Sequence, residues 1–294
     1  MVCRAEGSDV VTSPTTAIAI AAKVRRGYWR DVAMSIAKSA LTGIIATVVI
    51  IGLWAASLKL LNIPSFVGKS PLDVLAYFFS VPAAAENREF VGEMLAKSMV
   101  DSAIGFVAGL AGALVLASIF VLARRVEHAL LPIALLLQTV PLIAMAPIII
   151  LIFGRDTATV AVMGGLVVLF PALVTIVFGL RSASPAMIDV VTVYGGSPFT
   201  ALVKIAIPSA LPAFFAAVKI SVPGAITGAL IAEWLATGQG IGRAIVSAIG
   251  QAKISEVWAL GIVITAVSIT LYMLVGFIES LVLARMGVKP EPLR

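Results

Sequence analysis

Cysteine and histidine are almost absent from this chain of 294 residues. Cys3 is the single cysteine, so no disulfide can form within the chain. His128 is the single histidine and stands beside Arg124 and Arg125, where we expect a solvated or headgroup-facing side chain and not a proton relay. With so few nitrogen and sulfur ligands, we expect no metal centre in this chain.

Charge is scarce as well. Only 12% of the residues are charged, whereas soluble domains carry about 25%. Hydrophobic residues make up 61% of the chain and gather in runs long enough to cross a hydrocarbon core about 30 Å thick. We therefore predict an all-α integral membrane protein with about six membrane-spanning helices. The runs lie near residues 39–61, 100–123, 129–153, 158–180, 209–235 and 257–284.

The distribution of lysine and arginine predicts the orientation, because short cytoplasmic segments hold the excess of positive charge. With the N-terminus inside, both termini and the loop 181–208 face the cytoplasm. The same bias accounts for the net charge of +6, so we infer no nucleic-acid partner. The basic cluster near the N-terminus follows its apolar stretch, which is not the order of a signal peptide. The predicted organisation is a cytoplasmic tail over 1–34, a transmembrane domain over 35–285 and a second cytoplasmic tail over 286–294.

Residues 189–208 predict a helical hairpin between two apolar runs. Gly195 and the glycine after it can adopt the left-handed conformation that ends a helix. Ser197 can cap the next helix, Pro198 suits its first position, and Pro208 is expected to break the chain again. A plain loop between two membrane helices is the alternative. The hairpin residues expected to contact a partner are Asp189, Tyr194, Gly195, Gly196, Ser197, Pro198, Lys204 and Pro208.

The run 129–153 is interrupted by proline. Pro141 and Pro147 each remove a backbone donor and collide with the preceding turn, so the freed carbonyl groups must face protein or a wet cavity. Gln138 and Thr139 stand beside this break and could offer an amide and a hydroxyl group to a solute. A kinked helix whose polar side chains bond neighbouring helices is the alternative. The residues expected to line a pathway are Gln138, Thr139, Pro141, Met145, Pro147 and Glu233.

Two charged residues lie inside the run 209–235, where an ionised group is costly. Glu233 should lie near the outer interface with partial hydration. It either contacts solute or bonds the backbone of the turn over residues 238–240, and we favour the second role. Lys219 should snorkel toward the cytoplasmic end of its helix and contact lipid or carbonyl oxygens.

The spacing from Asp189 through Gly195 to Pro208 resembles the cytoplasmic EAA loop of permease subunits in bacterial ABC importers, with Asp-Val-Val in place of Glu-Ala-Ala. Together with the proline-broken run and the stretch 232–242, it is similar to the nitrate/sulfonate/taurine group of these permeases over roughly residues 98–285. The resemblance implies that two permease subunits line one pathway. It also implies that separate ATPases bind the cytoplasmic loops and that an extracytoplasmic binding protein delivers the solute.

The long polar interval 62–99 then faces the outside. Residues 70–73, Ser-Pro-Leu-Asp, are typical of a capped helix start, and residues 86–97 are charged enough to predict a surface helix. A connecting hairpin would explain this segment, but we favour a shelf that the solute-binding protein contacts.

We therefore expect the permease subunit of an ATP-driven importer of type I in the bacterial inner membrane, paired with an identical or a non-identical permease. The chain lacks the motif G-x-x-x-x-G-K-[ST], so it should not be an enzyme, and ATP and Mg²⁺ should bind to a partner ATPase. The neutral Gln138 and Thr139 favour a neutral or aromatic solute, or selection by the binding protein.

Two other classes of protein remain as alternatives. Ion-coupled secondary transporters typically contain membrane-embedded acids or a duplicated broken helix. Glu233 alone is weak evidence for this class. A non-transporting scaffold would need neither the broken run nor the cytoplasmic hairpin.

Overall fold

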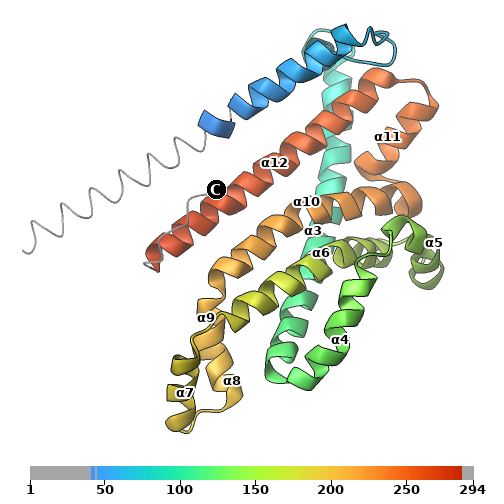
Figure 1. The fold of residues 1–294 in the computed structure, drawn as a ribbon. Coiled ribbons are helices and arrows are strands. Elements are labelled where there is room, and N and C mark those ends of the chain that lie inside the picture. Colours follow the sequence, from blue (N-terminus) through green and yellow to red (C-terminus); the bar gives the residue numbers. More distant parts are fainter. Residues whose placement is uncertain (1–40, 44, 287–294) are drawn as a thin grey trace, which may run out of the picture. The chain divides into compact units, whose positions relative to one another are not determined.

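The computed structural model describes residues 41–43 and 45–286, so the predicted tail 1–34 and residues 287–294 of the C-terminal tail lie outside the described residues (Figure 1). The chain divides into two compact units at the junction of Pro71 and Leu72. The first unit contains the apolar helix Leu41–Leu60, which has the length and composition of a membrane span and buries almost none of its side chains. All of the helices described next belong to the second unit, except for the first residue of α2.

The described residues contain helices and no strand. Two short segments, η1 and η2, are π-helical, with a turn wider than that of an α-helix. The elements are α2 (Pro71–Phe79), α3 (Ala84–Leu122), α4 (Arg124–Leu137), α5 (Leu142–Phe153), α6 (Thr157–Arg181), α7 (Pro185–Val193), α8 (Pro198–Ala201), η1 (Leu202–Ala206), α9 (Ile207–Ser209), α10 (Leu211–Ala232), η2 (Glu233–Thr237), α11 (Gly240–Gly250) and α12 (Ile254–Arg285).

Five helices of the described residues are long and apolar enough to cross a membrane. Helices α4 and α5 together would make a sixth span, but they are bent by 106° at the residues between them. This confirms the predicted all-α membrane fold with about six spans. The predicted helix start at residues 70–73 is also confirmed, because α2 begins at Pro71.

The helix predicted for residues 86–97 is present, but it is longer than predicted. These residues form the first turns of α3, which continues unbroken to Leu122 over 39 residues. At 1.5 Å per residue such a helix is about 58 Å long, well beyond the thickness of a hydrocarbon core. The charged residues make the first turns of α3 polar. They do not end the helix, because charged residues are compatible with a helical backbone and α3 contains no proline.

The predicted break at Pro208 is also wrong. Helix runs from Pro198 to Ser209 through η1, and the interruption falls at Ala210 instead. The ring of a helical proline collides with the carbonyl group four residues earlier, which here belongs to Lys204 inside η1. The wider turn of η1 relieves this contact, so the helix continues past the proline.

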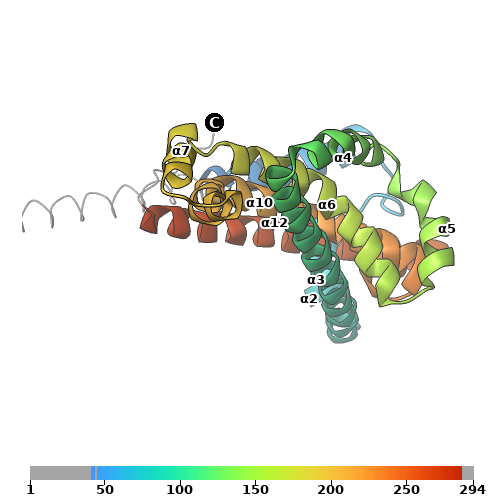
Figure 2. The same ribbon diagram turned by 90° about the horizontal axis from the view of Figure 1, so that it is seen from below.

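The core of the second unit is the crossing of α3, α6 and α10, which Figures 1 and 2 show from two sides. A Cβ atom on Gly105 of α3 would lie 2.8 Å from the Cα atom of Gly164 in α6. A Cβ atom on Gly228 of α10 would lie 2.7 Å from that same Cα atom. Real Cβ atoms do not approach so closely, so the three backbones can meet only because these residues have no side chains.

Gly164→Val should separate these three helices. Overpacking of a close contact costs about 3 kcal/mol at the upper end of the usual range, so we expect a lower melting temperature and a lower yield of folded protein. Fluorescence-detected size exclusion after heating measures both. The control is Gly261→Val in α12, where a Cβ atom meets nothing within 4 Å. Equal stability of the two variants would show that the glycine contact is not required.

Candidate functional site

Helices α7 and α8 form the predicted hairpin, joined by a tight turn. Gly195 has φ of 79°, in the left-handed region, as predicted. Gly196 does not have a positive φ. Its N–H donates to the carbonyl group of Val191 at 2.8 Å, and a side chain at this position would overlap Val191. The hydroxyl of Ser197 accepts the N–H of Thr200 at 3.2 Å and caps α8, as predicted. The turn is therefore fixed by local hydrogen bonds.

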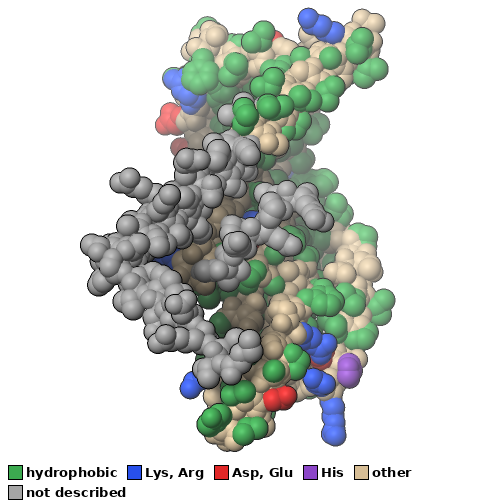
Figure 3. Space-filling view, turned by 60° about the vertical axis from the view of Figure 1, so that its left-hand side comes forward, with side chains coloured by type: hydrophobic (Ala, Val, Ile, Leu, Met, Phe, Trp, Pro, Cys, Tyr) green, Lys and Arg blue, Asp and Glu red, His purple; other side chains and the backbone are tan. Residues whose placement is uncertain are grey.

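The tip of the hairpin is apolar and exposed. The side chains of Val193 and Tyr194 are 84% and 88% exposed, and no residue of α7 is buried. Met187, Val190 and Phe199 are also more than half exposed. Figure 3 shows hydrophobic side chains at its lower end, at the level of α7 and α8 in Figure 1. The tip therefore presents a group of apolar side chains that no described part of the chain covers.

The other face of the hairpin is packed. Leu202 and Ala206 of η1 are buried in a cluster with Leu180 at the end of α6. Val126 of α4 and Ile188 of α7 pack against the same cluster. The hairpin is thus anchored on one face and free on the other. Of the residues predicted to contact a partner, Gly196 is half-buried and the others are exposed: Asp189, Tyr194, Gly195, Ser197, Pro198, Lys204 and Pro208.

An ion pair that the sequence did not predict lies at the base of the hairpin. Glu127, in the first turn of α4, is only 2% exposed and pairs with Arg181, the last residue of α6. A buried carboxylate needs such a partner, because its desolvation is costly. The pair ties α4 to the residue from which the hairpin departs. The neighbouring His128 is exposed, as predicted.

The predicted break in the third span lies between α4 and α5. Pro141 has an extended backbone, with φ of −60° and ψ of 123°, and α5 begins at the next residue. Pro147 is exposed and lies inside α5, where it removes a backbone donor, as predicted, without ending the helix. The ring of Pro147 meets only the carbonyl group four residues earlier, in the first turn of α5. The helix therefore loses one backbone hydrogen bond and continues.

The polar residues of this break differ in their availability. Gln138 and Thr139 are both exposed, but the hydroxyl of Thr139 donates to the carbonyl group of Leu136 at 2.7 Å. Its hydroxyl is therefore already used within the chain, and the amide of Gln138 is the better candidate for a solute contact. Pro141 is exposed, whereas Met145 is half-buried in the cluster that joins α5, α6 and α10.

Glu233 lies apart from this break and is fully buried. Its carboxylate accepts the N–H of Gly242 at 2.7 Å, and the hydroxyl of Ser98 accepts the N–H of Ile241 at 2.8 Å. These two side chains hold the N-terminus of α11. The expected partial hydration is wrong, because Gly240, where a side chain would overlap the carboxylate, lets α11 close over it. The geometry is that of the structural role, and a contact with solute stays a prediction.

Lys219 does not reach lipid or carbonyl oxygens as expected. Its ammonium group pairs with Glu279 of α12, and both side chains are about four-fifths buried. An opposite charge on the adjacent helix is a better partner in a medium of low dielectric constant than a distant interface. The pair therefore fastens α12 to α10.

Comparison with known proteins identifies the family. Residues 103–288 match the family described as binding-protein-dependent transport system inner membrane component. A probable ABC transporter permease protein of Haemophilus influenzae is 26% identical over 224 residues, which cover 76% of this chain and 89% of the relative. The putative aliphatic sulfonates transport permease protein SsuC of Bacillus subtilis is 27% identical over 225 residues, with 76% and 80% covered.

A third relative carries another solute name. The riboflavin transport system permease protein RibX of Chloroflexus aurantiacus is 29% identical over 158 residues, which cover 54% of this chain and 59% of the relative. The matched family region holds α4, α5, the hairpin and α11. This chain therefore belongs to the binding-protein-dependent transport system inner membrane components and is a permease subunit of an ABC importer.

Proposed function

We propose that α7 and α8 dock onto a separate ATPase at the cytoplasmic face and that the membrane helices move a small organic solute inward. The observation that carries this proposal is the one-sided hairpin, with Val193 and Tyr194 exposed and Leu202 packed against the bundle. ATP and Mg²⁺ would bind to the partner, and this chain would supply the mechanical element. An exposed apolar tip on a rigid base is suited to fill a groove in another protein.

The cytoplasmic orientation of the hairpin is part of the same proposal. Arg124 and Arg125 begin α4 and Arg181 ends α6, so three arginines lie at the end of the helices that carries the hairpin. Positive charge of this kind favours the cytoplasmic side of an inner membrane. Docking of an ATPase requires the same orientation, since ATP is cytoplasmic.

The hairpin would transmit motion through α4. The cluster around Leu180 and Leu202 and the ion pair of Glu127 with Arg181 connect the hairpin to this helix. Helix α4 leads directly to the break beside Gln138. A nucleotide can shift such an equilibrium only if the ATPase binds the two states of the permease with different affinity. The hairpin must therefore present a different surface in each state.

Further partners follow from what this subunit leaves exposed. The polar break at Gln138 is exposed, so we propose that a second permease subunit covers it and completes the pathway.

At the other end of the second unit, the corner between α2 and α3 is fixed by Asn87, which donates to the carbonyl group of Tyr77 at 2.9 Å. We propose that a solute-binding protein docks at this end.

The first test removes the apolar tip. The double variant Val193→Ser, Tyr194→Ser should weaken binding of the partner ATPase about thirtyfold and reduce co-purification, because truncation of a central apolar anchor costs about 2 kcal/mol of binding energy. Membrane insertion should be unchanged. The control is Ile249→Ser in α11, which is also more than half exposed but lies at the other end. Co-purification of the tip variant at the wild-type level would refute the docking role of the tip.

The second test breaks the pair at the base of the hairpin. Glu127→Gln should lower the amount of solute moved per ATP hydrolysed, while the ATPase still binds, because α4 no longer follows the hairpin. The charge left behind belongs to Arg181, which is 45% exposed, so we expect a modest loss of stability, and folding is checked by size exclusion. The swap of Glu127→Arg with Arg181→Glu should recover part of the coupling. Glu279→Gln, which breaks the pair with Lys219, is the control and should leave the ratio unchanged. No recovery in a folded swap variant would argue against the pair as the link.

The third test concerns the pathway. Gln138→Leu should lower the initial rate of uptake about tenfold while the yield of complex stays normal, because it removes a polar partner from the route. Thr139→Val is the matched control, since its hydroxyl serves the backbone, and it should keep most of the rate. Uptake by the Gln138 variant at the wild-type rate would assign this residue a structural role.

A further inference from the structure

Four buried side-chain oxygen atoms of α3 and η2 have no hydrogen-bond partner in the described part of the chain. They are Oδ2 of Asp101 and Oγ of Ser102 on α3, and Oε1 of Glu233 and Oγ1 of Thr237 on η2. Asp101 is 2% exposed and Glu233 is fully buried. Buried polar atoms nearly always have a partner, because an unpartnered one loses its bonds to water without replacement. Four such atoms on two elements therefore point to a bound group.

The crossing of the three glycines brings the two buried acids to the same level of the bundle. Gly105 of α3 and Gly228 of α10 both contact Gly164 of α6. Asp101 precedes Gly105 by four residues and Glu233 follows Gly228 by five, so each lies about one turn from the crossing. Helix α11 begins after Glu233 and packs against α3, which places both acids on the same side of the crossing.

Contacts of Ser98 show that the two groups of oxygens face each other. Ser98 lies on the same face of α3 as Asp101 and Ser102, because residues three and four apart are neighbours on a helix. Its hydroxyl bonds the carboxylate of Glu233, and the charge of Asp101 also acts on this carboxylate. Thr237 stands four residues after Glu233, about one turn along η2. Glu233 and Thr237 therefore face the turn of α3 that carries the other two oxygens.

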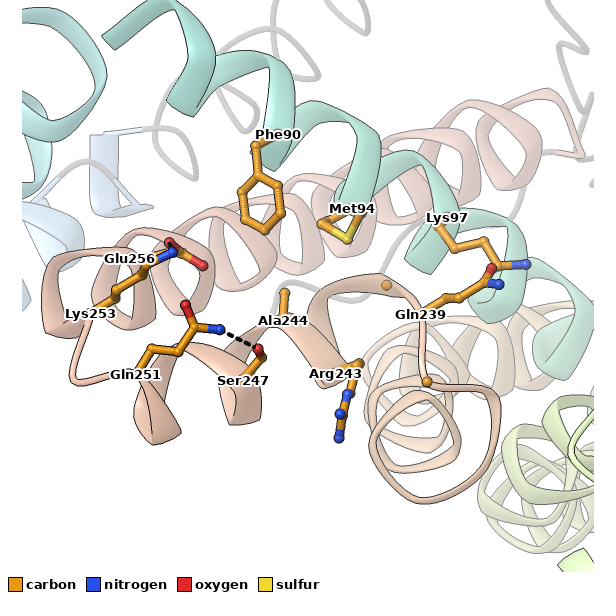
Figure 4. A pocket seen from close by; sticks show the side chains of 12 residues that line it. Phe90, Met94, Lys97, Gln239, Arg243, Ala244, Ser247, Gln251, Lys253 and Glu256 are labelled. Atoms are coloured by element: carbon orange, nitrogen blue, oxygen red, sulfur yellow. Dashed lines mark hydrogen bonds and ion pairs between the residues drawn. The ribbon is translucent and has the colours of Figure 1, made fainter. Parts of the chain in front are cut away.

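This cluster holds more negative than positive charge. Lys97 lies 3.5 Å from Oδ1 of Asp101 and is the positive partner of that carboxylate. Among the described residues no cation pairs with Glu233, and the N-terminus of α11 offers it only partial positive charge. Arg243 is exposed, and Figure 4 shows its guanidinium group pointing away from Lys97. A buried carboxylate without a counter-ion is costly, so the cluster requires one more positive charge.

A monovalent cation meets both requirements. A water molecule can bond the oxygens but brings no charge, and a proton neutralises Glu233 but joins only two of the four oxygens. Carboxylate and hydroxyl oxygens are ligands of hard cations, so the scarcity of cysteine and histidine does not count against such a site. A divalent ion would leave an excess of positive charge. The described residues also hold no group of three His, Cys, Asp or Glu side chains that could bind one.

A pocket of about 530 Å³ between α3, α11 and the start of α12 gives access to the cluster. Figure 4 shows Lys97 and Gln239 at the same end of this pocket. Gly240 also lines it, and a side chain on this glycine would overlap the carboxylate of Glu233. Only the backbone of this turn therefore separates the pocket from the carboxylate, and an ion can enter by a small movement of the turn.

We propose that Asp101, Ser102, Glu233 and Thr237 bind a small monovalent cation. The ion would join α3 to η2 and so hold the start of α11 in place. This site shares no residue with the hairpin or with the break beside Gln138. Its test needs neither an ATPase nor a solute, so it stands or fails separately from the proposed function.

The test measures binding of radiolabelled Na⁺ to the full chain in phosphatidylcholine nanodiscs, with N-methylglucamine chloride keeping the ionic strength constant. We expect saturable binding that unlabelled Na⁺ displaces. Glu233→Gln should abolish it, because this variant keeps the shape of the side chain and removes the unbalanced charge. Ser102→Ala should weaken it about tenfold or more, as the loss of a group at a metal site typically does. The matched control is Glu279→Gln, which removes the buried partner of Lys219 and should bind Na⁺ as the wild type does.

The melting temperature gives a second readout. Na⁺ should raise it in the wild type and not in Glu233→Gln, because an ion bound only to the folded state stabilises that state. Absence of saturable binding, or unchanged binding in a folded Glu233→Gln variant, would overturn the proposal. Should that variant fail to fold, unchanged binding in Ser102→Ala would overturn it instead. If Na⁺ has no effect and acidification raises the melting temperature, a proton neutralises Glu233 and the cation site is wrong.

Discussion

The contact of α3, α6 and α10 at three glycines is the constraint on which the rest of the second unit depends. In lipid, apolar helices gain little from touching one another, so they associate through close packing of their backbones. Gly105, Gly164 and Gly228 permit this packing, and it fixes the two ends of the bundle together. Helices α6 and α10 carry the hairpin at one end, and α10 carries Glu233 and α11 at the other.

Hydropathy and proline placement predicted the spans and the break beside Pro141, because both depend on local sequence. The local geometry of Gly195 and Ser197 was predictable for the same reason. The length of α3 was not, since charged residues end a hydrophobic run without ending a helix. Pro208 would interrupt a regular α-helix. The π-helical turn before it accommodates the proline ring, so the helix continues.

Features that join distant segments escaped prediction. Glu127 and Arg181 are separated by 54 positions, and nothing in their spacing points to a contact. For Glu233, the sequence offered a structural and a solute-binding role, and only the fold shows that α11 closes over its carboxylate. A pocket between α3 and α11 draws its lining from both helices and from the turns beside α11, so no single stretch of sequence predicts it.

The exposed tip of the hairpin affects how long an unassembled subunit would survive in the cell. Val193 and Tyr194 are exposed, and in the proposed cytoplasmic location such an apolar patch would attract chaperones and proteases. In the assembly proposed above, a copy without an ATPase keeps this surface exposed, whereas an assembled copy covers it. Subunits made in excess would then be removed first, so the composition of the transporter could be controlled by degradation as well as by the rate of synthesis.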